Sequence, residues 1–253
     1  MSDFEFRTSD GTTYLTCLPF EEEGFTAVFS TREGAADLEP VEATAERLLA
    51  AIGRKGARLA TCKQVHSSKV RIVRNDRDVR DRATECDAVT ACEPGLLLGI
   101  KTADCVPVLV ADRLTGAVAG IHAGWRGAAD RIVERAFAAM MVSWKTDRED
   151  CIAAIGPAVC ASCYEVGPEV LERFRTEFPY ASRVISNLHG DKGHVDLKDT
   201  CATQLELCGV DPENIFVSEA CTMCSNDRFP SYRKEGARAG RILSVVGQNT
   251  GRG

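Results

Sequence analysis

The chain has 253 residues, of which 44% are hydrophobic and 27% charged, a composition typical of a globular protein with a substantial core. The net charge of −6 and the pI near 5.4 argue against nucleic acid as a partner, because binding a phosphate backbone normally needs a basic surface. No run approaches the roughly 18 apolar residues of a membrane span, and the N-terminus lacks the pattern of a signal peptide. We therefore expect a cytoplasmic protein with no membrane partner.

Apolar, β-branched and aromatic runs alternate with segments of helical spacing along the whole chain. In chain order, the first half predicts a strand pair within residues 1–24, a strand at 25–32, a helix at 40–53, a strand at 70–73, a surface loop at 75–85, and strands at 87–90, 96–100 and 106–110. The second half predicts a strand at 117–121, a helix at 128–144, a strand at 151–155, helices at 168–178 and 198–208 separated by a glycine-rich turn at 189–194, and strands at 215–217 and 241–246. Because no linker or repeat interrupts this order, residues 1–253 are predicted to form one compact α/β or mixed α+β domain.

The stretch TGAVAGIHAGWRG, residues 115–127, predicts a short apolar strand that enters a turn and then a helix. The glycines expected to permit positive φ or close backbone approach there are Gly120, Gly124 and Gly127. The turn would bring His122, Trp125 and Arg126 to one edge of a sheet, beside helix N–H groups that suit an anion. A purely structural turn with a core tryptophan and a buried histidine fits the same residues.

Three residues at the ends of separate apolar segments are a candidate metal site: His66, Cys105 and His122. Zinc held by three nitrogen or sulfur ligands plus water is the catalytic pattern. The spacing of the three residues forms no local motif, and two histidines with one cysteine also suit copper. The same cysteine could instead be the nucleophile of a hydrolase, with His122 as base and with Asp104 or another carboxylate orienting that histidine.

Two CxxC pairs form a second candidate site, a structural zinc bound by Cys160, Cys163, Cys221 and Cys224. The pairs lie farther apart in sequence than the roughly 15–20 residues of common zinc modules. The zinc deaminase motif, His-x-Glu followed by Pro-Cys-x-x-Cys, is absent. Most of the twelve cysteines are expected to be reduced core residues.

Eight blocks of sequence carry a resemblance to a known family. They are KQVH (63–66), DAVT (87–90), TADCVPV (102–108), IHAGWRG (121–127), IGP (155–157), YEV (164–166), VDL (195–197) and SYR (231–233). In this order they resemble the bacterial purine nucleoside phosphorylases, a family formerly labelled multicopper polyphenol oxidases or laccase-domain proteins. The resemblance covers about residues 29–246.

The resemblance implies a zinc ion held by His66, Cys105 and His122. It implies phosphorolysis of adenosine, inosine, guanosine and methylthioadenosine to the base and ribose 1-phosphate or its methylthio analogue, and deamination of adenosine in the same pocket. The expected partners are thus purine nucleosides and phosphate. The implied fold is a sandwich of two mixed sheets flanked by helices, similar to the catalytic domain of the cytotoxic necrotising factors.

Roles for individual residues follow as hypotheses. Zinc would act as a Lewis acid on phosphate or on water, and would lower the pKa of water enough for deamination near neutral pH. Arg32, Arg126 and Arg233 are candidates for holding phosphate. Asp104 is a candidate for orienting a ligating histidine.

Three other functions stay open. A multicopper oxidase needs several copper sites built mostly from imidazoles, which the four histidines cannot supply, although a single copper could still oxidise phenols. A cysteine hydrolase acting on amide bonds, as in peptidoglycan precursors, is the second, and a zinc-stabilised module that binds a partner is the third. The sequence leaves open the preferred nucleoside, the pathway and the oligomeric state.

Overall fold

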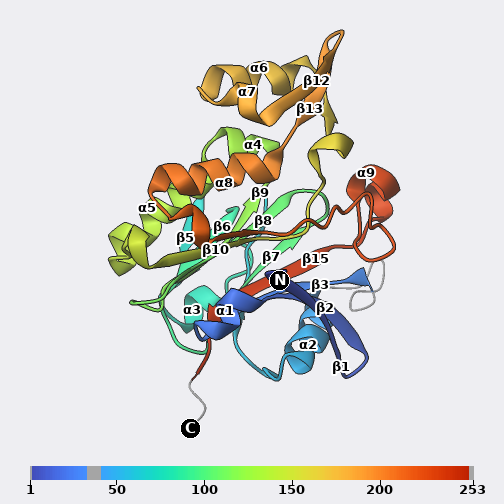
Figure 1. Ribbon diagram of the computed structural model, residues 1–253. Coiled ribbons are helices and arrows are strands. Elements are labelled where there is room, and N and C mark those ends of the chain that lie inside the picture. The colour runs from blue at the N-terminus through green and yellow to red at the C-terminus, as the bar shows by residue number, and fades with distance from the viewer. Residues whose placement is uncertain (1, 33–40, 251–253) are drawn as a thin grey trace.

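Two six-stranded mixed sheets lie face to face in the computed structural model, which describes residues 2–32 and 41–250 (Figure 1). The first sheet has the order β1-β2-β3-β15-β7-β4, with bounds Phe4–Ser9, Thr12–Cys17, Phe25–Ser30, Ile242–Gln248, Leu97–Thr102 and Leu59–Ala60. The second has the order β14-β10-β8-β9-β6-β5, with bounds Ile215–Val217, Cys151–Ile155, Val106–Asp112, Val118–Ala123, Ala88–Ala91 and Val70–Ile72. Neighbouring strands are antiparallel except in the pairs β4–β7, β5–β6 and β10–β14.

Apolar side chains from both sheets, such as Phe29 and Leu109, fill the space between them. Consecutive residues of a strand face opposite sides, so β8 contributes to two cores: Leu109 packs between the sheets, whereas Val108 and Val110 face the helices. A strand covered on both faces is apolar at nearly every position. This burial explains the uninterrupted apolar run in β8.

Helices cover the outer faces of both sheets. α5 (Ile132–Trp144) and α8 (Leu197–Cys208) pack on the second sheet, and α2 (Val41–Ala51) packs on the first through Leu48. The shorter helices are α1 (Leu18–Glu22), α3 (Asp76–Arg80), α4 (Trp125–Ala129) and α9 (Tyr232–Glu235), and 3-10 turns lie at Arg148–Asp150, Ala161–Cys163, Pro212–Asn214 and Gly236–Arg238. The layers therefore follow the order helix, sheet, sheet, helices.

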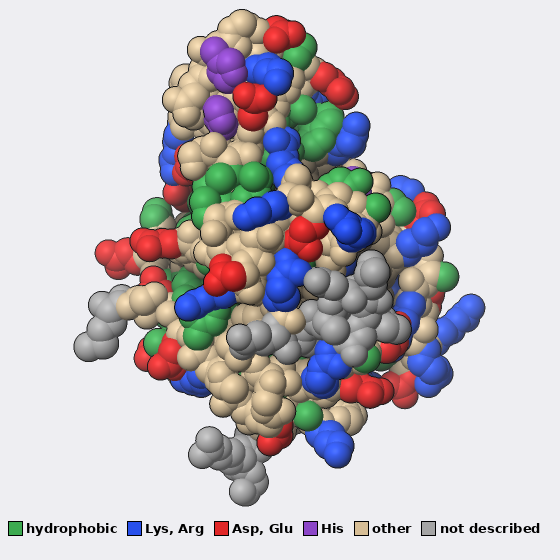
Figure 2. Space-filling view, turned by 90° about the vertical axis from the view of Figure 1, so that its right-hand side faces the viewer, with side chains coloured by type: hydrophobic (Ala, Val, Ile, Leu, Met, Phe, Trp, Pro, Cys, Tyr) green, Lys and Arg blue, Asp and Glu red, His purple; other side chains and the backbone are tan. Residues whose placement is uncertain are grey.

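A small three-stranded sheet stands beyond α4 and α8. Its order is β11-β13-β12, with bounds Glu165–Val166, Lys192–Val195 and Ile185–His189, and it carries α6 (Pro168–Glu177) and α7 (Ala181–Val184). Figure 2 shows this part as a projection at the top of the molecule. Phe174 and Val184 bury their side chains in the same core as Phe137 of α5, which ties the projection to the body.

The mixed α+β class and the predicted strands are confirmed, with ends shifted by a few residues. Three local expectations are corrected. The loop predicted at 75–85 contains α3, whose first turn donates two backbone N–H groups to the side chain of Asn75. The helix predicted at 128–144 is divided into α4 and α5 at Arg131, which has a φ of 59°. The turn predicted at 189–194 is the end of the β12–β13 hairpin.

Residue 40, the expected start of the first helix, lies outside the described residues, and the described part of that helix begins at Val41. Among the described helices, none combines the length and the apolar character needed to cross a bilayer.

The close approach of the two sheets is testable at Gly156, which directly follows β10. A Cβ added there would lie 2.1 Å from Cε1 of Phe29 on the opposite sheet. Gly156→Ala is therefore expected to displace Phe29 and to lower the free energy of unfolding by about 1–3 kcal/mol in denaturant titrations. Gly167→Ala is the control, because nothing lies within 4 Å of its added Cβ. Equal stability of the two variants would contradict this packing.

Candidate active site

One fully buried carboxylate, that of Asp87, lies immediately before β6 and organises the turn between β4 and β5. It accepts backbone N–H groups from Val65 at 3.2 Å, His66 at 2.9 Å and Ser67 at 2.6 Å. The Ser67 hydroxyl donates to the same carboxylate at 2.7 Å. The turn thus wraps around a buried negative charge, which several donors stabilise.

The same carboxylate orients His122, the penultimate residue of β9. Nδ1 of His122 donates to Oδ1 of Asp87 at 2.8 Å, and the backbone N–H of His122 donates to the Asp87 carbonyl at 2.7 Å. A histidine whose Nδ1 is held in this way has Nε2 available for a metal. Asp87 therefore positions two histidines that come from different parts of the chain.

Cys105 reaches the site from the connection between β7 and β8, where the chain crosses from the first sheet to the second. Asp104 in this connection has a φ of 84°. Its carboxylate accepts from the Thr222 hydroxyl at 2.6 Å and from the backbone N–H of Arg233 at 2.7 Å. The prediction that Asp104 orients a ligating histidine is therefore corrected, because Asp87 makes that hydrogen bond.

The three predicted ligands are brought together, and their ligand atoms all lie within 4.8 Å of one another. Nε2 of His66 is 3.9 Å from Sγ of Cys105, and the rings of His66 and His122 meet edge to face at 4.8 Å. Zinc bonds of about 2.0 Å to nitrogen and 2.3 Å to sulfur imply ligand separations of about 3.5 Å. The trio therefore fits a metal ion once its ligand atoms move closer together, by about 0.4 Å for Nε2 of His66 and Sγ of Cys105 and by up to about 1.3 Å for a pair at the 4.8 Å limit.

Gly124 lies next to this trio, where there is no room for a side chain; its φ is not positive. Gly124 caps α4 with a φ of −73°, and a Cβ added to it would lie 3.0 Å from Cδ2 of His66 and 3.1 Å from Sγ of Cys105. Gly120 and Gly127 also lie close to neighbouring atoms without a positive φ. The expectation of close backbone approach is confirmed here, and the expectation of positive φ is wrong.

The charges of the site favour a metal-binding thiolate. Burial alone would raise the pKa of Cys105, but hydrogen bonds to His122 and His66 lower it to about 6. Burial would lower the pKa of His122, but Asp87 and Cys105 raise it to about 9. Burial would raise the pKa of Asp87, whereas His122 and Ser67 lower it to about 2. Cys105 is thus favoured as the thiolate at neutral pH, the form that binds metals.

A cavity of about 910 Å³ opens over the trio. Its volume lies within the range of about 300–1,000 Å³ typical of small-molecule sites. The basic residues that line it are Lys63, Lys101, Arg233 and Arg241, and among the described lining residues the only acidic one is Asp104. Tyr164 and Tyr232 add aromatic rings. The lining therefore suits an anion and a flat ring.

Of the three predicted phosphate-binding arginines, Arg233 lines this cavity, and its Cζ lies 4.4 Å from the ring centre of Tyr164. Arg32 donates to the Glu235 carboxylate at 2.5 Å and to the Asn226 carbonyl at 3.0 Å. Burial alone would raise the pKa of Glu235, but Arg32 and other donors lower it to about 2, so this ion pair persists at neutral pH. Phosphate binding by Arg32 stays a prediction.

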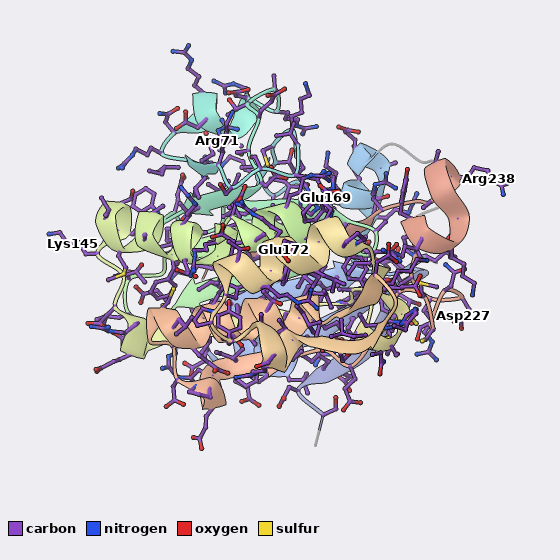
Figure 3. All side chains as sticks on the ribbon, turned by 90° about the horizontal axis from the view of Figure 1, so that it is seen from above. Arg71, Lys145, Glu169, Glu172, Asp227 and Arg238 are labelled. Atoms are coloured by element: carbon purple, nitrogen blue, oxygen red, sulfur yellow. The ribbon has the colours of Figure 1, made fainter. Side chains whose placement is uncertain are left out.

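Arg126 lies at the surface of α4, with 57% of its side chain exposed and its Cζ 4.2 Å from the ring centre of Trp125. Its guanidinium is 4.0 Å from the carboxylate of Glu169, which is labelled in Figure 3 and belongs to α6, the uppermost helix in Figure 1. Neither Arg126 nor Trp125 is among the described residues that line the cavity. Its role in phosphate binding also stays a prediction.

Several residues at the site were not singled out from the sequence for any role. The sequence predicts Asp87 as the first residue of a strand and as part of a family block, but assigns it no role; its usable signal is an acidic residue at the start of a buried strand. Tyr164, Lys101 and Arg241 join the cavity from segments far apart in the chain, so no local spacing could reveal them.

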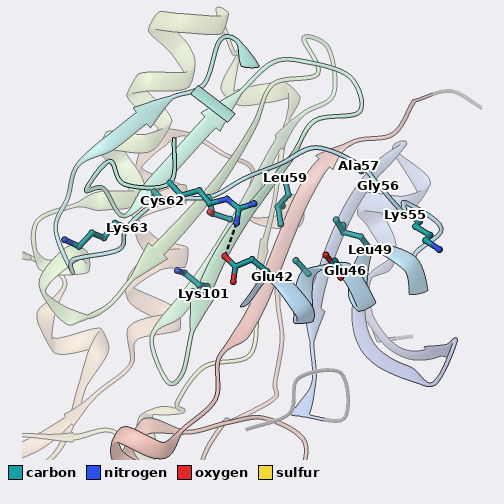
Figure 4. A pocket seen from close by; sticks show the side chains of 13 residues that line it. Glu42, Glu46, Leu49, Lys55, Gly56, Ala57, Leu59, Cys62, Lys63 and Lys101 are labelled. Carbon is teal, nitrogen blue, oxygen red and sulfur yellow. Dashed lines mark hydrogen bonds and ion pairs between the residues drawn. The ribbon is translucent and has the colours of Figure 1, made fainter. Parts of the chain in front are cut away.

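A second cavity, of about 620 Å³, adjoins the first and shares Lys63 and Lys101 with it (Figure 4). Glu42 of α2 and Arg82 form an ion pair of 2.9 Å in its wall. Among its described lining residues there is no histidine, and its only cysteine is the buried Cys62. The metal-ligating groups therefore select the first cavity as the candidate active site.

A family model described as multi-copper polyphenol oxidoreductase laccase matches residues 29–249. The chain belongs to this family. This confirms the family predicted from the eight sequence blocks.

Curated relatives bear enzyme names. Purine nucleoside phosphorylase of Bacteroides thetaiotaomicron is 41% identical over 161 residues, which cover 63% of this chain and 60% of that protein, less than two thirds of its length. Adenosine deaminase RL5, from an unknown prokaryotic organism, is 36% identical over 192 residues, which cover 73% of this chain and 72% of that protein. Purine nucleoside phosphorylase YfiH of Shigella flexneri is 33% identical over 241 residues, which cover 88% of this chain and 94% of that protein. This member of the family is likewise an enzyme.

Solved structures in the family share the fold. YlmD from Geobacillus stearothermophilus superposes with a TM-score of 0.86 at 28% identity, covering 97% of this chain and 99% of that one. YfiH from Bacillus licheniformis, at 24% identity, gives a TM-score of 0.87 and covers 96% of this chain and 99% of that one. The arrangement of two large sheets with flanking helices is therefore that of the family.

Because Asp87 both holds the His66 turn and orients His122, its replacement is expected to weaken metal binding. Asp87→Asn is expected to weaken the affinity of the trio for a divalent metal by about 10- to 100-fold, because the amide has no negative charge and its NH2 group cannot accept the hydrogen bonds that one carboxylate oxygen accepts from the His66 turn or from His122. Competition with a chromophoric chelator measures this affinity.

Asp112→Asn is the matched control. Asp112 is also a fully buried carboxylate that holds a turn, accepting from the backbone N–H groups of Leu114 at 2.9 Å and Thr115 at 3.0 Å. It lies at the opposite end of the β8–β9 hairpin. Equal metal affinities in the two variants would show that Asp87 has no special role.

Proposed function

We propose that this enzyme is a zinc-dependent purine nucleoside phosphorylase that also deaminates adenosine. The observation that carries the proposal is the meeting of His66, Cys105 and His122 at a cavity with four basic lining side chains. A site for phosphorolysis must hold an anion and a nucleoside side by side, and this cavity offers cations and aromatic rings. The names of the relatives support the same activities for this chain.

His66, Cys105 and His122 would hold the zinc ion. Two imidazoles and a thiolate suit zinc, and three protein ligands leave a position open, as in catalytic sites. Zinc, when bound, supplies a Lewis acid that polarises phosphate or water. The other histidines, His189 and His194, lie on the small sheet with ring centres 6.2 Å apart, so the imidazoles of a multicopper centre do not gather at this cavity.

Arg233, Lys101 and Arg241 would bind phosphate. Their charges surround the cavity, and a charge-assisted hydrogen bond to phosphate is stronger than a neutral one. The backbone of Arg233 is fixed by Asp104, and its guanidinium rests on the ring of Tyr164. Together these contacts would limit the positions that the guanidinium can adopt when phosphate enters.

Tyr164 and Tyr232 would contact the nucleoside. Burial raises the pKa of Tyr164 to about 12, so its hydroxyl stays protonated at neutral pH and can donate a hydrogen bond. The ring of Tyr232, which is 53% exposed, offers a flat surface suited to a purine.

A cysteine hydrolase is the second candidate, because Nε2 of His66 lies 3.9 Å from Sγ of Cys105, a distance that allows a cysteine–histidine pair. The two candidates differ in how the enzyme is inactivated. A hydrolase would work without metal and be inactivated by alkylation of Cys105, whereas the phosphorylase would lose activity on chelation and regain it with zinc.

Product analysis of adenosine incubated with the zinc-loaded enzyme tests the proposal. Adenine and ribose 1-phosphate are expected only when phosphate is present, and inosine is expected without phosphate. Cys105→Ser is expected to lose both activities, by more than the roughly 10- to 100-fold typical of outer partners of a metal. Unchanged adenosine in both tubes, or full activity of Cys105→Ser, would contradict the proposal.

The phosphate role of Arg233 predicts a specific kinetic change. Arg233→Gln is expected to raise the KM for phosphate by roughly 10- to 100-fold, the effect of losing a charge-assisted hydrogen bond of about 1.5–3 kcal/mol. Deamination does not use phosphate and should change much less. Arg173→Gln, which removes a surface arginine paired with Asp130, is the control. A loss of both activities to the same extent would instead indicate a structural role for Arg233.

A further inference from the structure

Four cysteines outside the candidate active site come together from two distant segments. Cys160 and Cys163 lie at the 3-10 turn before β11, and Cys221 and Cys224 lie in the turn that follows β14. All four Sγ atoms lie within 4.8 Å of one another, and those of Cys163 and Cys224 are 3.5 Å apart. The four are free thiols in the structure.

The backbone around the cluster is arranged to receive negative charge. The N–H groups of Cys160 and Cys224 both point at Sγ of Cys221, at 3.3 and 3.5 Å. Such donors stabilise a thiolate, the form that binds a metal. Lys198 adds a buried positive charge nearby, because its Nζ donates to the carbonyls of Ser218 and Ala220 at 2.5 and 2.8 Å, directly before Cys221.

From this geometry we infer that Cys160, Cys163, Cys221 and Cys224 bind a second zinc ion, which is structural. Four thiolates close a tetrahedral site and leave no position for substrate or water. Zinc–sulfur bonds of about 2.3 Å imply sulfur separations of about 3.8 Å. The 3.5 Å between Sγ of Cys163 and Sγ of Cys224 is close to this value, and all the other pairs lie within 4.8 Å. The two CxxC pairs supply the local spacing that such sites use.

This second zinc would hold one wall of the candidate active site. Cys163 is followed by Tyr164, which lines the cavity. Cys221 is followed by Thr222, whose hydroxyl donates to Asp104 at 2.6 Å and whose N–H donates to the Ala158 carbonyl at 3.1 Å. The metal would thus fasten together two segments that are distant in sequence and that position Tyr164 and Asp104.

The chain that follows Cys224 leads to Arg233, which lines the cavity. In Figure 3, Asp227, which follows Cys224 in the same turn, and Arg238 lie at the same side of the molecule. The segment between them carries Arg233, whose backbone N–H is bound by Asp104. Loss of the second zinc should therefore loosen substrate contacts, whereas His66 and His122 stay held by the carboxylate of Asp87.

The first experiment counts zinc by elemental mass spectrometry in the purified wild type and in variants. We expect two zinc ions per chain in the wild type, one in Cys105→Ala and one in the double variant Cys163→Ser/Cys224→Ser. Cys92→Ser is the matched control and should keep two, since a hydroxyl can replace the thiol that donates to the Thr115 carbonyl at 3.2 Å. A single zinc in the wild type that disappears in Cys105→Ala would overturn the inference, as would iron in place of the second zinc.

The second experiment does not depend on folding of the double variant. Cys105→Ala is refilled with cobalt, and we expect one cobalt per chain with the intense visible absorption of tetrahedral thiolate coordination. Absence of this absorption, or disulfides between these cysteines in protein isolated without reductant, would overturn the inference. Both readouts are independent of nucleoside chemistry, so they stand even if the proposed function fails.

Enzyme kinetics of the double variant distinguish the role of the second zinc from that of the first. If the double variant folds, its KM for adenosine should rise several-fold and its melting temperature should fall, while the zinc that depends on Cys105 is retained. Unchanged KM and melting temperature after loss of the second zinc would overturn its role in holding the cavity wall.

Discussion

The buried carboxylate of Asp87 is the interaction on which the candidate active site depends. Without a partner, a fully buried charge would be strongly destabilising. Here its partners are the backbone of the His66 turn, the Ser67 hydroxyl and Nδ1 of His122. The hydrogen bonds to this carboxylate thus stabilise the loop that carries His66 and fix the orientation of the His122 ring. The hydrogen bonds that stabilise the Asp87 carboxylate therefore also set the positions of two metal ligands.

The third ligand is placed by the way the chain passes between the two sheets. β7 belongs to the first sheet and β8 to the second, so their connection has to cross the edge of the sandwich, and Cys105 lies at its end. Asp104 holds this crossing against Thr222 and against Arg233, which lines the cavity. Thr222 directly follows Cys221, one member of the four-cysteine cluster. Metal ligands, cavity and cluster are therefore one connected system.

The sequence predicted what depends on local pattern. The apolar run of β8 correctly indicated a buried strand, since both faces of this strand are covered. α3 was not predicted, because its charged residues resemble those of a surface loop, although the side chain of Asn75 caps the helix. The spacing of His66, Cys105 and His122 alone allowed a metal site or a cysteine nucleophile, and the family resemblance favoured the metal site. The role of Asp87 depends on His122, 35 residues along the chain, and no local spacing encodes such a contact. Asp104 was a candidate for orienting a histidine, but in the folded chain its carboxylate accepts from the Thr222 hydroxyl and from the backbone N–H of Arg233.

The most direct test of this account is anomalous diffraction at the zinc absorption edge from crystals of the zinc-loaded enzyme. An anomalous peak is expected at about 2.0–2.1 Å from a ring nitrogen of His66 and of His122, and at about 2.3 Å from Sγ of Cys105. Nδ1 of His122 should still donate its hydrogen bond to the Asp87 carboxylate. An active crystal form with no metal among these three residues, or with His122 turned away from Asp87, would contradict the account.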